Sequence, residues 1–146
     1  MSNLSLIPVT SKNRRAIEKL KVFPHQTGFI ESVADCMKEA DQLAAWHPMC
    51  IYDNDTLIGF TMYGMIQEPA YTRLWFDRLL IDKAFQGRGY AKAAIAALLE
   101  RLRQEYPCRR VYLSVYGDNA AAIHLYQQAG FSFRSEERRV GKECRL

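Results

Sequence analysis

The segment IDKAFQGRGYA, residues 81–91, joins an apolar stretch to a long amphipathic one through a turn that holds two glycines. Residues 74–81 are apolar and aromatic and have the length of a half-buried strand. After the turn, apolar residues recur at helical spacing: Ala91, Ala94, Ile95, Leu98, Leu99 and Leu102. The start of a helix leaves backbone N–H groups unpaired and carries a partial positive charge, and Gly87 and Gly89 would let a pyrophosphate approach those donors. The segment therefore predicts a strand, a phosphate-binding turn and a helix.

Two common phosphate-binding motifs do not fit this turn. A dinucleotide-binding fingerprint requires a glycine or alanine three positions after Gly89, where the sequence has Lys92. A nucleoside triphosphate-binding loop requires Gly-Lys followed by Ser or Thr, and Gly141-Lys142 precedes Glu143. The turn either belongs to another phosphate-binding class or connects strand and helix without a ligand.

The turn resembles the acyl-CoA signature of the GCN5-related N-acetyltransferases, Gln/Arg-x-x-Gly-x-Gly/Ala, because residues 86–91 read QGRGYA. A second block, residues 119–131, resembles the closing element of that family: an Asn, a helix ending in Leu-Tyr, then Gly-Phe. The local chemistry agrees, since Asp118 or Asn119 is a good helix N-cap and Gly130 stands where a left-handed C-terminal cap is expected. Two blocks at the spacing of the family make the resemblance specific.

The resemblance implies an α/β fold with a mixed sheet, mostly antiparallel with one parallel pair of strands, flanked by about four helices. The hydrophobic pattern places the elements in the same order. The expected strands are 4–9, 49–53, 57–66, 72–82, 110–116 and 131–134, and the expected helices begin at Thr10 or Ser11 and end near 20, then span 30–46, 89–105 and 118–129.

One acetyltransferase domain over residues 1–134 accounts for the length of the chain, which at 146 residues leaves no room for a second. Residues 135–146 form an almost wholly polar tail, where the family normally ends on an apolar strand. The tail is either a degenerate last strand around 140–146 or a foreign end.

Composition narrows the class of protein further. The chain is 49% apolar and 25% charged, which is ordinary for a globular domain. No leader-like start and no apolar run of roughly 20 residues is present in the sequence, so we expect a cytoplasmic protein without a membrane partner. Half of the net charge of +4 lies in residues 134–146, so a nucleic-acid partner is not expected. Cysteines at 36, 50, 108 and 144 lack metal-ligand spacing, and we expect no metal.

The resemblance assigns acetyl-CoA as the co-substrate and Tyr126 as the general acid beside its sulfur. Backbone groups of Leu79 and Ile81 would pair with the pantetheine, and Asn119 and its helix would border it. The implied coenzyme-binding residues are Leu79, Ile81, Gln86, Gly87, Arg88, Gly89, Tyr90, Ala91, Asn119, Ala122 and Tyr126. Without the resemblance, Tyr126 would read as an ordinary aromatic residue of the core.

Asp77 is the candidate general base. Strand alternation predicts Asp77 and Leu79 on one face and Phe76, Arg78 and Leu80 on the other, one step from the expected acetyl group. Several polyamine acetyltransferases carry a carboxylate at the matching position, as the resemblance implies. A salt bridge to a neighbouring cation such as Arg78 is the alternative interpretation.

The phrases at residues 29–32, 59–64, 75–78 and 110–114 resemble small bacterial spermine/spermidine acetyltransferases. The expected function is therefore transfer of an acetyl group to a primary amine of a polyamine, and Glu31, Asp35 and Asp77 are the candidate carboxylates for its charges. A solvated helix face is the alternative for Glu31 and Asp35. Acetylation of another small amine or of a protein amino group, or a non-catalytic acyl-CoA sensor, remain open, and a homodimer is possible.

Overall fold

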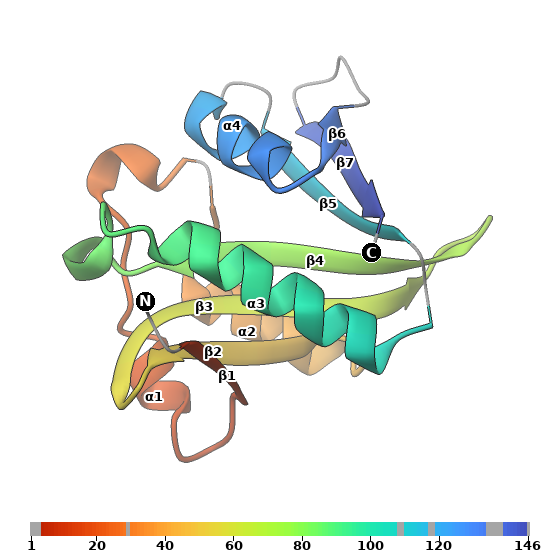
Figure 1. Cartoon of the computed structure of the whole chain (residues 1–146). Helices are drawn as coiled ribbons and strands as arrows, with labels where there is room; N and C mark the ends of the chain where they lie inside the picture. Colours follow the sequence, from red (N-terminus) through yellow and green to blue (C-terminus); the bar gives the residue numbers. More distant parts are fainter. Residues whose placement is uncertain (1–3, 29, 108–109, 117–118, 134–138, 146) are drawn as a thin grey trace.

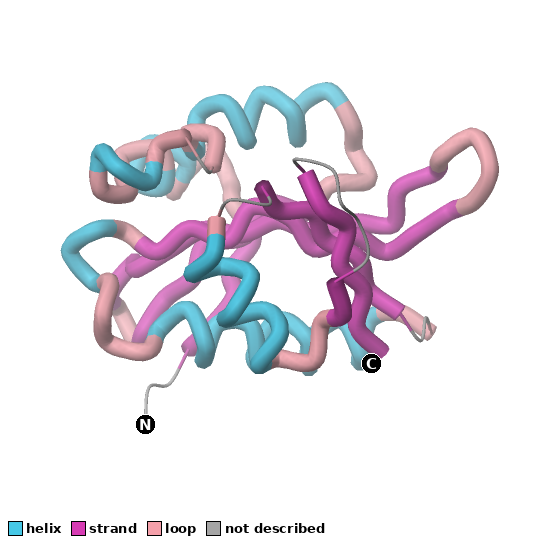
Figure 2. The backbone as a smooth tube through the Cα atoms, turned by 90° about the horizontal axis from the view of Figure 1, so that it is seen from above, coloured by secondary structure: helices cyan, strands magenta, loops and turns pink. Residues whose placement is uncertain are grey.

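The computed structural model describes residues 4–28, 30–107, 110–116, 119–133 and 139–145. Cys108, Asp118 and the tail residues 135–138 and 146 lie outside this part of the chain. The described residues form a sheet with helices on both faces (Figures 1 and 2). None of their helices is long and apolar enough to cross a membrane.

The sheet has seven strands among the described residues, in the order β1-β2-β3-β4-β5-β7-β6. All neighbours pair antiparallel except β4 and β5, which run parallel. The strands are β1 (Leu4–Pro8), β2 (His47–Asp53), β3 (Thr56–Gln67), β4 (Thr72–Ile81), β5 (Arg110–Tyr116), β6 (Ser132–Phe133) and β7 (Arg139–Arg145). The predicted mixed sheet with one parallel pair is confirmed.

The polar tail contributes strand β7, which lies between β5 and β6. Its register places residue 139 opposite Tyr116 and residue 145 opposite Arg110. Of the two alternatives for the tail, the structure therefore has a strand, and the domain boundary at residue 134 stays a prediction.

Four α-helices are present in the described ranges: α1 (Arg14–Ile17), α2 (Val33–Gln42), α3 (Tyr90–Glu105) and α4 (Ala120–Gln128). Two short 3-10 turns, η1 (Pro24–Gln26) and η2 (Lys83–Phe85), precede α2 and α3. Helix α3 crosses one face of the sheet, and α2 lies on the other (Figure 1).

The first two helices are shorter than the sequence predicts. Helix α1 begins only at Arg14, because the Asn13 side chain holds the preceding residues in a turn beside β1. This side chain accepts from the N–H of Thr10 at 2.8 Å and donates to the carbonyl of Pro8 at 3.1 Å. Helix α2 begins at Val33 rather than near 30, because the Ser32 hydroxyl caps it by accepting from the N–H of residue 35 at 3.1 Å. The expected bounds 10–20 and 30–46 are therefore wrong.

Two hydrophobic clusters fill the two faces. Residues of α3 and α4 pack on one side of the central strands, with Phe76, Ile95 and Leu98 buried there. Residues of α2 pack on the other side, around Phe60 and Met37. The sheet is therefore covered on both faces where β3 and β4 cross the middle of the molecule.

Strand β4 carries a β-bulge at Arg78. The backbone φ of this residue is 60°, in the left-handed region that residues other than glycine rarely adopt. Asp77 lies opposite Met62 of β3 and Leu80 lies opposite Phe60, so two residues of β4 face one of β3. The bulge interrupts the ladder in the middle of the central strand.

The bulge overturns the predicted alternation along β4. Phe76 and Leu79, three residues apart, pack in the same hydrophobic cluster, whereas Leu80 packs in the opposite one. The extra residue leaves Asp77 and Arg78 together on the α2 side, where their side chains form an ion pair. The prediction that Asp77 shares a face with Leu79 is therefore wrong.

Strands β4 and β5 are in register at a single described pair, Trp75 with Tyr112. Beyond that pair β5 turns away from β4, and α4 lies above the widening gap (Figure 1). The carboxyl end of β4 therefore has backbone on its β5 side that no described strand covers.

Candidate active site

A cavity of about 370 Å³ lies where β4 and β5 separate. The end of β4, the turn at the start of α3, the start of α4 and parts of segment 22–31 form its walls. Val115 of β5 also lines it, so the cavity collects, from five parts of the chain, nearly all of the residues that the sequence singles out.

The glycine turn forms one end of the cavity. Gly87 and Gly89 have φ values of 80° and 81°, which favour glycine, and a Cβ at either position would meet open space. Gly89 is the N-cap of α3 and has no side chain to cover the first N–H groups of the helix. Open space above unpaired donors and a positive helix end fit a pyrophosphate.

Gln86 and Arg88 flank the glycines and use their side chains differently. The Gln86 amide exchanges two hydrogen bonds of 2.9 Å with Gln26 and donates a third, also of 2.9 Å, to the carbonyl of Ile81. The Arg88 side chain is exposed, and its guanidinium lies 5.6 Å from the ring centre of Phe85. Gln86 lines the cavity and braces the turn, whereas Arg88 does not line it.

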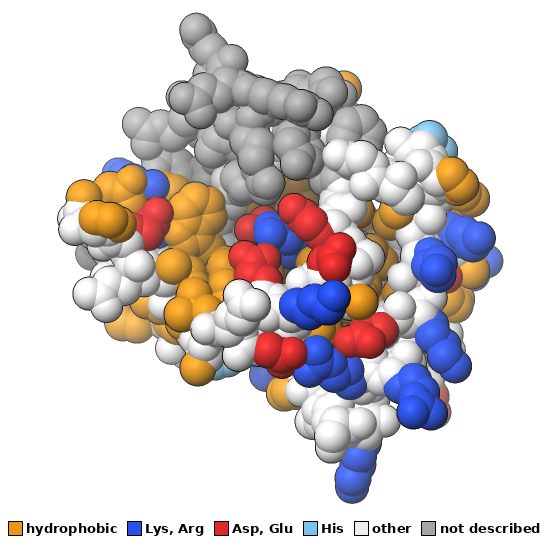
Figure 3. All heavy atoms as spheres, turned by 180° about the vertical axis from the view of Figure 1, so that it is seen from behind, with side chains coloured by type: hydrophobic (Ala, Val, Ile, Leu, Met, Phe, Trp, Pro, Cys, Tyr) orange, Lys and Arg blue, Asp and Glu red, His pale blue; other side chains and the backbone are white. Residues whose placement is uncertain are grey.

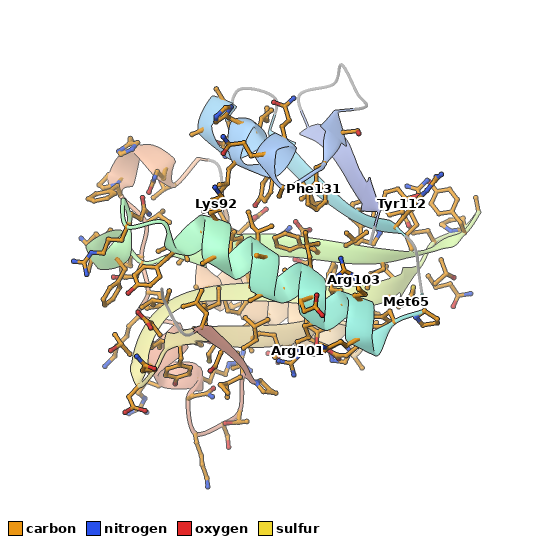
Figure 4. The ribbon with its side chains drawn as sticks, in the orientation of Figure 1. Met65, Lys92, Arg101, Arg103, Tyr112 and Phe131 are labelled. Atoms are coloured by element: carbon orange, nitrogen blue, oxygen red, sulfur yellow. The ribbon has the colours of Figure 1, made fainter. Side chains whose placement is uncertain are left out.

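The first turn of α3 continues this wall. Tyr90 and Ala91 line the cavity, as does Lys92, which rises from the start of α3 toward α4 in Figure 4. The Tyr90 hydroxyl donates to Asp53 at the end of β2, which ties the helix start to the sheet.

Backbone and side chains of β4 form the floor, where Leu79 and Ile81 line the cavity. Beyond Trp75, which pairs with Tyr112, the side of β4 that faces β5 has no register partner among the described residues. An extended chain with amide groups could therefore pair with β4 here, as an additional strand would.

Helix α4 forms the roof. Asn119 is its N-cap, and its side chain accepts from the N–H of Ala122 at 3.3 Å. Both residues line the cavity. Asn119, rather than Asp118, therefore caps the helix, and Asp118 lies outside the described residues.

Tyr126 lies one helical turn further along α4 and also lines the cavity. Its ring makes edge contacts with Phe76 and Phe131, with centres 5.9 and 5.8 Å away, and Figure 4 shows Phe131 beneath α4. Burial raises the pKa of the Tyr126 hydroxyl above its usual range, and the charge of Asp77 raises it further. The hydroxyl therefore stays protonated at neutral pH and can donate a proton.

Acidic side chains lie at the end of the cavity opposite the glycine turn. Asp77 and Glu31 line it, and Arg78 lines it between them. The carboxylate of Asp77 accepts from the Arg78 guanidinium at 2.5 Å and from the Arg78 N–H at 3.2 Å. The ion pair that sequence analysis gave as the alternative for Asp77 is therefore present.

Asp35 lies apart from this group. It is exposed on α2 and does not line the cavity. The face of the molecule that carries α2 shows acidic side chains gathered around basic ones near its middle (Figure 3).

Sequence reasoning missed Gln26, named Arg78 only as an alternative ion-pair partner of Asp77, and placed Glu39 only within the locally acidic segment 31–41. Gln26 gave no motif, because its partner is 60 positions away. Arg78 was assigned to the wrong face, and Glu39 becomes relevant only through its ion pair with Arg78 at 2.9 Å. The acidic composition of segment 31–41 was the only available signal for Glu39.

The described residues hold no group of three or more His, Cys, Asp or Glu side chains arranged to bind a metal ion. Cys36 and Cys50 are buried free cysteines, and burial raises the pKa of the Cys36 thiol to about 12 and that of Cys50 to about 11. Both thiols stay neutral near pH 7 and behave as small apolar side chains.

Comparison with known proteins agrees with this geometry. Residues 13–131 match the model of the acetyltransferase (GNAT) family. The chain is 39% identical to a probable spermine N(1)-acetyltransferase of Bacillus subtilis subsp. natto, and 38% identical to the spermine/spermidine N(1)-acetyltransferase of Bacillus subtilis strain 168. Each alignment covers 92% of this chain and 91% of the relative.

The fold is also similar to that of a solved structure, the spermidine N-acetyltransferase from Vibrio cholerae in complex with CoA and spermine. The TM-score is 0.74 at 21% identity, over 98% of this chain and 94% of the other. At that identity the likeness concerns the fold.

Proposed function

This chain belongs to the acetyltransferase (GNAT) family, and on that premise we propose that it transfers an acetyl group from acetyl-CoA to a primary amine of a polyamine such as spermidine or spermine. The transfer is direct, within a complex of both substrates. One observation carries the proposal: Asp77 and Glu31 line the same cavity as the glycine turn and Tyr126.

The coenzyme end of the cavity suits acetyl-CoA, which supplies a thioester as the acetyl donor. The N–H groups at the start of α3 would hold the pyrophosphate beside Gly87 and Gly89. The uncovered side of β4 at Leu79 and Ile81 would pair with the amides of the pantetheine arm. A free N–H near Leu79 would also stabilise negative charge on the carbonyl oxygen during transfer.

The other end suits a cation. A primary amine with a pKa near 10.4, as in lysine, is protonated at pH 7, and removal of the proton costs roughly 4–5 kcal/mol. Asp77 and Glu31 would attract the ammonium, and Asp77 would accept its proton as the amine reacts. Asp35 does not line the cavity, so the proposal rests on the other two carboxylates.

Tyr126 would be the proton donor for the leaving thiolate. A thiolate leaves more readily when an acid protonates it, and its pKa is near 8.5 by analogy with cysteine. Because burial keeps the Tyr126 hydroxyl protonated at neutral pH, Tyr126 would supply that proton. Asp77 would thus accept the proton at the amine end of the reaction, and Tyr126 would donate one at the thiol end.

Free-thiol release tests this function directly. The protein is mixed with acetyl-CoA and, separately, with spermidine, spermine, lysine and an aminoglycoside. We expect thiol release with spermidine and spermine at rates well above those with lysine. Release with only the other amines would reassign the acceptor, and coenzyme binding without release for any amine would indicate a sensor.

A pair of variants tests the acidic end. Asp77→Asn should lower kcat/KM for spermine at neutral pH and flatten its pH dependence, whereas the control Asp41→Asn removes an exposed α2 carboxylate that is paired with Arg14. An unchanged pH profile in Asp77→Asn would remove Asp77 from the mechanism. A cytoplasmic location and a homodimer belong to the same proposal and can be tested by fractionation and light scattering.

A further inference from the structure

Arg78 occupies an unusual place for a basic residue in a cavity that would bind a polycation. It follows Asp77 directly, lies in the left-handed region at φ 60°, and its side chain is only 10% exposed. Non-glycine residues keep this conformation only where the surrounding contacts impose it, and such residues gather at functional sites.

Each nitrogen of the Arg78 guanidinium faces a different carboxylate. Nη1 donates to Asp77 at 2.5 Å and Nη2 donates to Glu39 at 2.9 Å. Nε lies 3.0 Å from Glu31, a contact that is close enough for an ion pair but lacks hydrogen-bond alignment. One side chain thus joins β4, α2 and the segment that precedes α2.

We infer that Arg78 is a positioning residue for the acetyl-transfer reaction: it keeps the Asp77 carboxylate ionised and fixed in the cavity, and Glu31 and Glu39 hold Arg78 in place. The inference rests on the proposed function. It adds two residues, Arg78 and Glu39, whose roles follow from the bulge rather than from any sequence motif.

The electrostatic reason lies in the groups that surround Asp77. Glu31 and Glu39 are like charges, and like charges disfavour the ionised form of a carboxylate. Cys36 from α2 and Tyr126 from α4 are neutral near pH 7, because burial raises the pKa of both groups. Arg78 is therefore the positive neighbour in direct contact with Asp77 that offsets the two acidic ones.

The guanidinium itself stays charged. Burial alone would lower the pKa of Arg78, but the charges of Asp77, Glu31 and Glu39 outweigh this effect and raise it. Without Arg78, Asp77, Glu31 and Glu39 would lose the cation that contacts all three, and repulsion among like charges would make protonation of a carboxylate easier.

The bulge explains how Arg78 can contact Asp77 of its own strand and the glutamates of the α2 side at the same time. In a regular strand Arg78 would point away from Asp77, toward the opposite face. The extra residue places both side chains on the α2 side, and the Arg78 N–H also contacts the Asp77 carboxylate at 3.2 Å. The carboxylate is therefore held at both oxygens by its own chain neighbour.

The test compares Arg78→Met with Arg78→Lys in the full chain. The ratio of variant to wild-type kcat/KM for spermine is measured from pH 5.5 to pH 7.5, which cancels the titration of the amine itself. For Arg78→Met we expect the ratio to fall toward pH 5.5, roughly fourfold if the carboxylate pKa rises by about two units, because loss of an adjacent opposite charge raises the pKa of a carboxylate by about 1–3 units. For Arg78→Lys the ratio should stay flat, although lower than 1, because the charge remains and the three-way contact is lost.

A double variant separates this effect from general loss of structure. In an Asp77→Asn background, Arg78→Met should no longer change the pH dependence, because the group that Arg78 acts on is absent. Coenzyme affinity and thermal unfolding are measured for every variant to confirm that the fold persists. A flat ratio in Arg78→Met, or the same pH shift with and without Asp77, would overturn the inference.

Glu39 allows a second test, in which an acidic side chain of the group is replaced instead of the basic one. Glu39→Gln removes a like charge from the group but also one anchor of Arg78, so we expect kcat/KM to fall severalfold without any shift toward higher pH. The control Asp41→Asn removes another carboxylate of α2 that pairs with a different arginine, Arg14, at 2.7 Å. Equal effects of the two substitutions would contradict a specific role for Glu39.

The outcomes also distinguish a failure of the proposed function from a failure of the role inferred for Arg78. If the wild-type protein releases thiol with spermine but Arg78→Met keeps the wild-type pH profile, the proposed function stands and the inference about Arg78 fails. If the wild-type protein neither binds nor acetylates any amine in the presence of acetyl-CoA, both fail.

Discussion

The two ends of the cavity are built in different ways. The coenzyme end comes from residues 86–91, which are contiguous and whose glycines have open space above them. The acidic end comes from Glu31 and the pair Asp77-Arg78, which the fold brings together from more than forty positions apart, with Glu39 paired to Arg78 outside the cavity lining. A local sequence motif therefore determines the first end, whereas the second depends on the register of the central strand β4.

Tyr126 stands between the two ends, and its substitution should have the largest effect. Tyr126→Phe removes the proposed acid but keeps the ring contacts with Phe76 and Phe131. We expect kcat to fall about 100-fold, as is typical for loss of a general acid, with little change in coenzyme affinity. Steady-state kinetics and calorimetric titration with CoA measure the two quantities.

The same substitution carries a pH prediction. Because burial raises the pKa of Tyr126, the wild-type hydroxyl stays protonated through pH 9, and no loss of rate below that pH should come from its ionisation. A wild-type rate that falls between pH 7 and pH 9, together with a flat profile in Tyr126→Phe, would contradict the assigned pKa direction.

Gly89 tests the coenzyme end alone. A side chain at φ 81° costs about 1–2 kcal/mol in backbone strain, so Gly89→Val should weaken CoA binding about tenfold through distortion of the turn. The matched control is Ala96→Val, an exposed position of α3 that has helical backbone and does not line the cavity. Equal affinity in the two variants would show that the turn does not contact the coenzyme.

The contrast between the ends also explains what the sequence could predict. The order of strands and helices and the position of the glycine turn follow from hydrophobic period and local turn chemistry, which act over a few residues. The parallel pair of strands was expected only because the family resemblance implied it. The first two helices begin later than predicted because Asn13 and Ser32 form local hydrogen bonds at the helix starts.

The acidic end could not be predicted in the same way. Alternation placed Arg78 on the face opposite Asp77, and one extra residue in β4 reversed that result. No local sequence pattern predicts a bulge at Arg78, because contacts with distant residues impose its left-handed backbone conformation. The role of Glu39 depends on the same contacts.

One pair of side chains connects the two ends. Gln26 belongs to the segment before α2 and Gln86 to the glycine turn, and their amides exchange two hydrogen bonds of 2.9 Å. Gln26→Ala should raise KM for spermine about threefold, since a hydrogen bond of this kind contributes about 0.5–1.5 kcal/mol. The control Gln104→Ala removes an amide of α3 that contacts only Glu100 in the described hydrogen bonds. A KM that is unchanged in both variants would mean that the two ends bind independently.

The smallest expected effects come from the two ends of α3, each of which is tied to the sheet by a tyrosine. Tyr90 donates to Asp53 beside the cavity, and Tyr63 of β3 donates to Glu105 at 2.7 Å at the far end. Burial and the neighbouring Glu105 raise the pKa of Tyr63, so its hydroxyl remains a donor. Both bonds join a neutral donor to a carboxylate and should contribute similar stability.

Tyr90→Phe and Tyr63→Phe should therefore each lower the free energy of unfolding by about 1–2 kcal/mol, a shift of a few degrees in Tm. Only Tyr90→Phe should also weaken CoA binding, by about threefold, because it loosens the helix start at which the glycine turn ends. Thermal unfolding and CoA titration of both variants measure this difference. If Tyr63→Phe weakened CoA binding as much as Tyr90→Phe, the coenzyme end would depend on the whole of α3, and its local character would be lost.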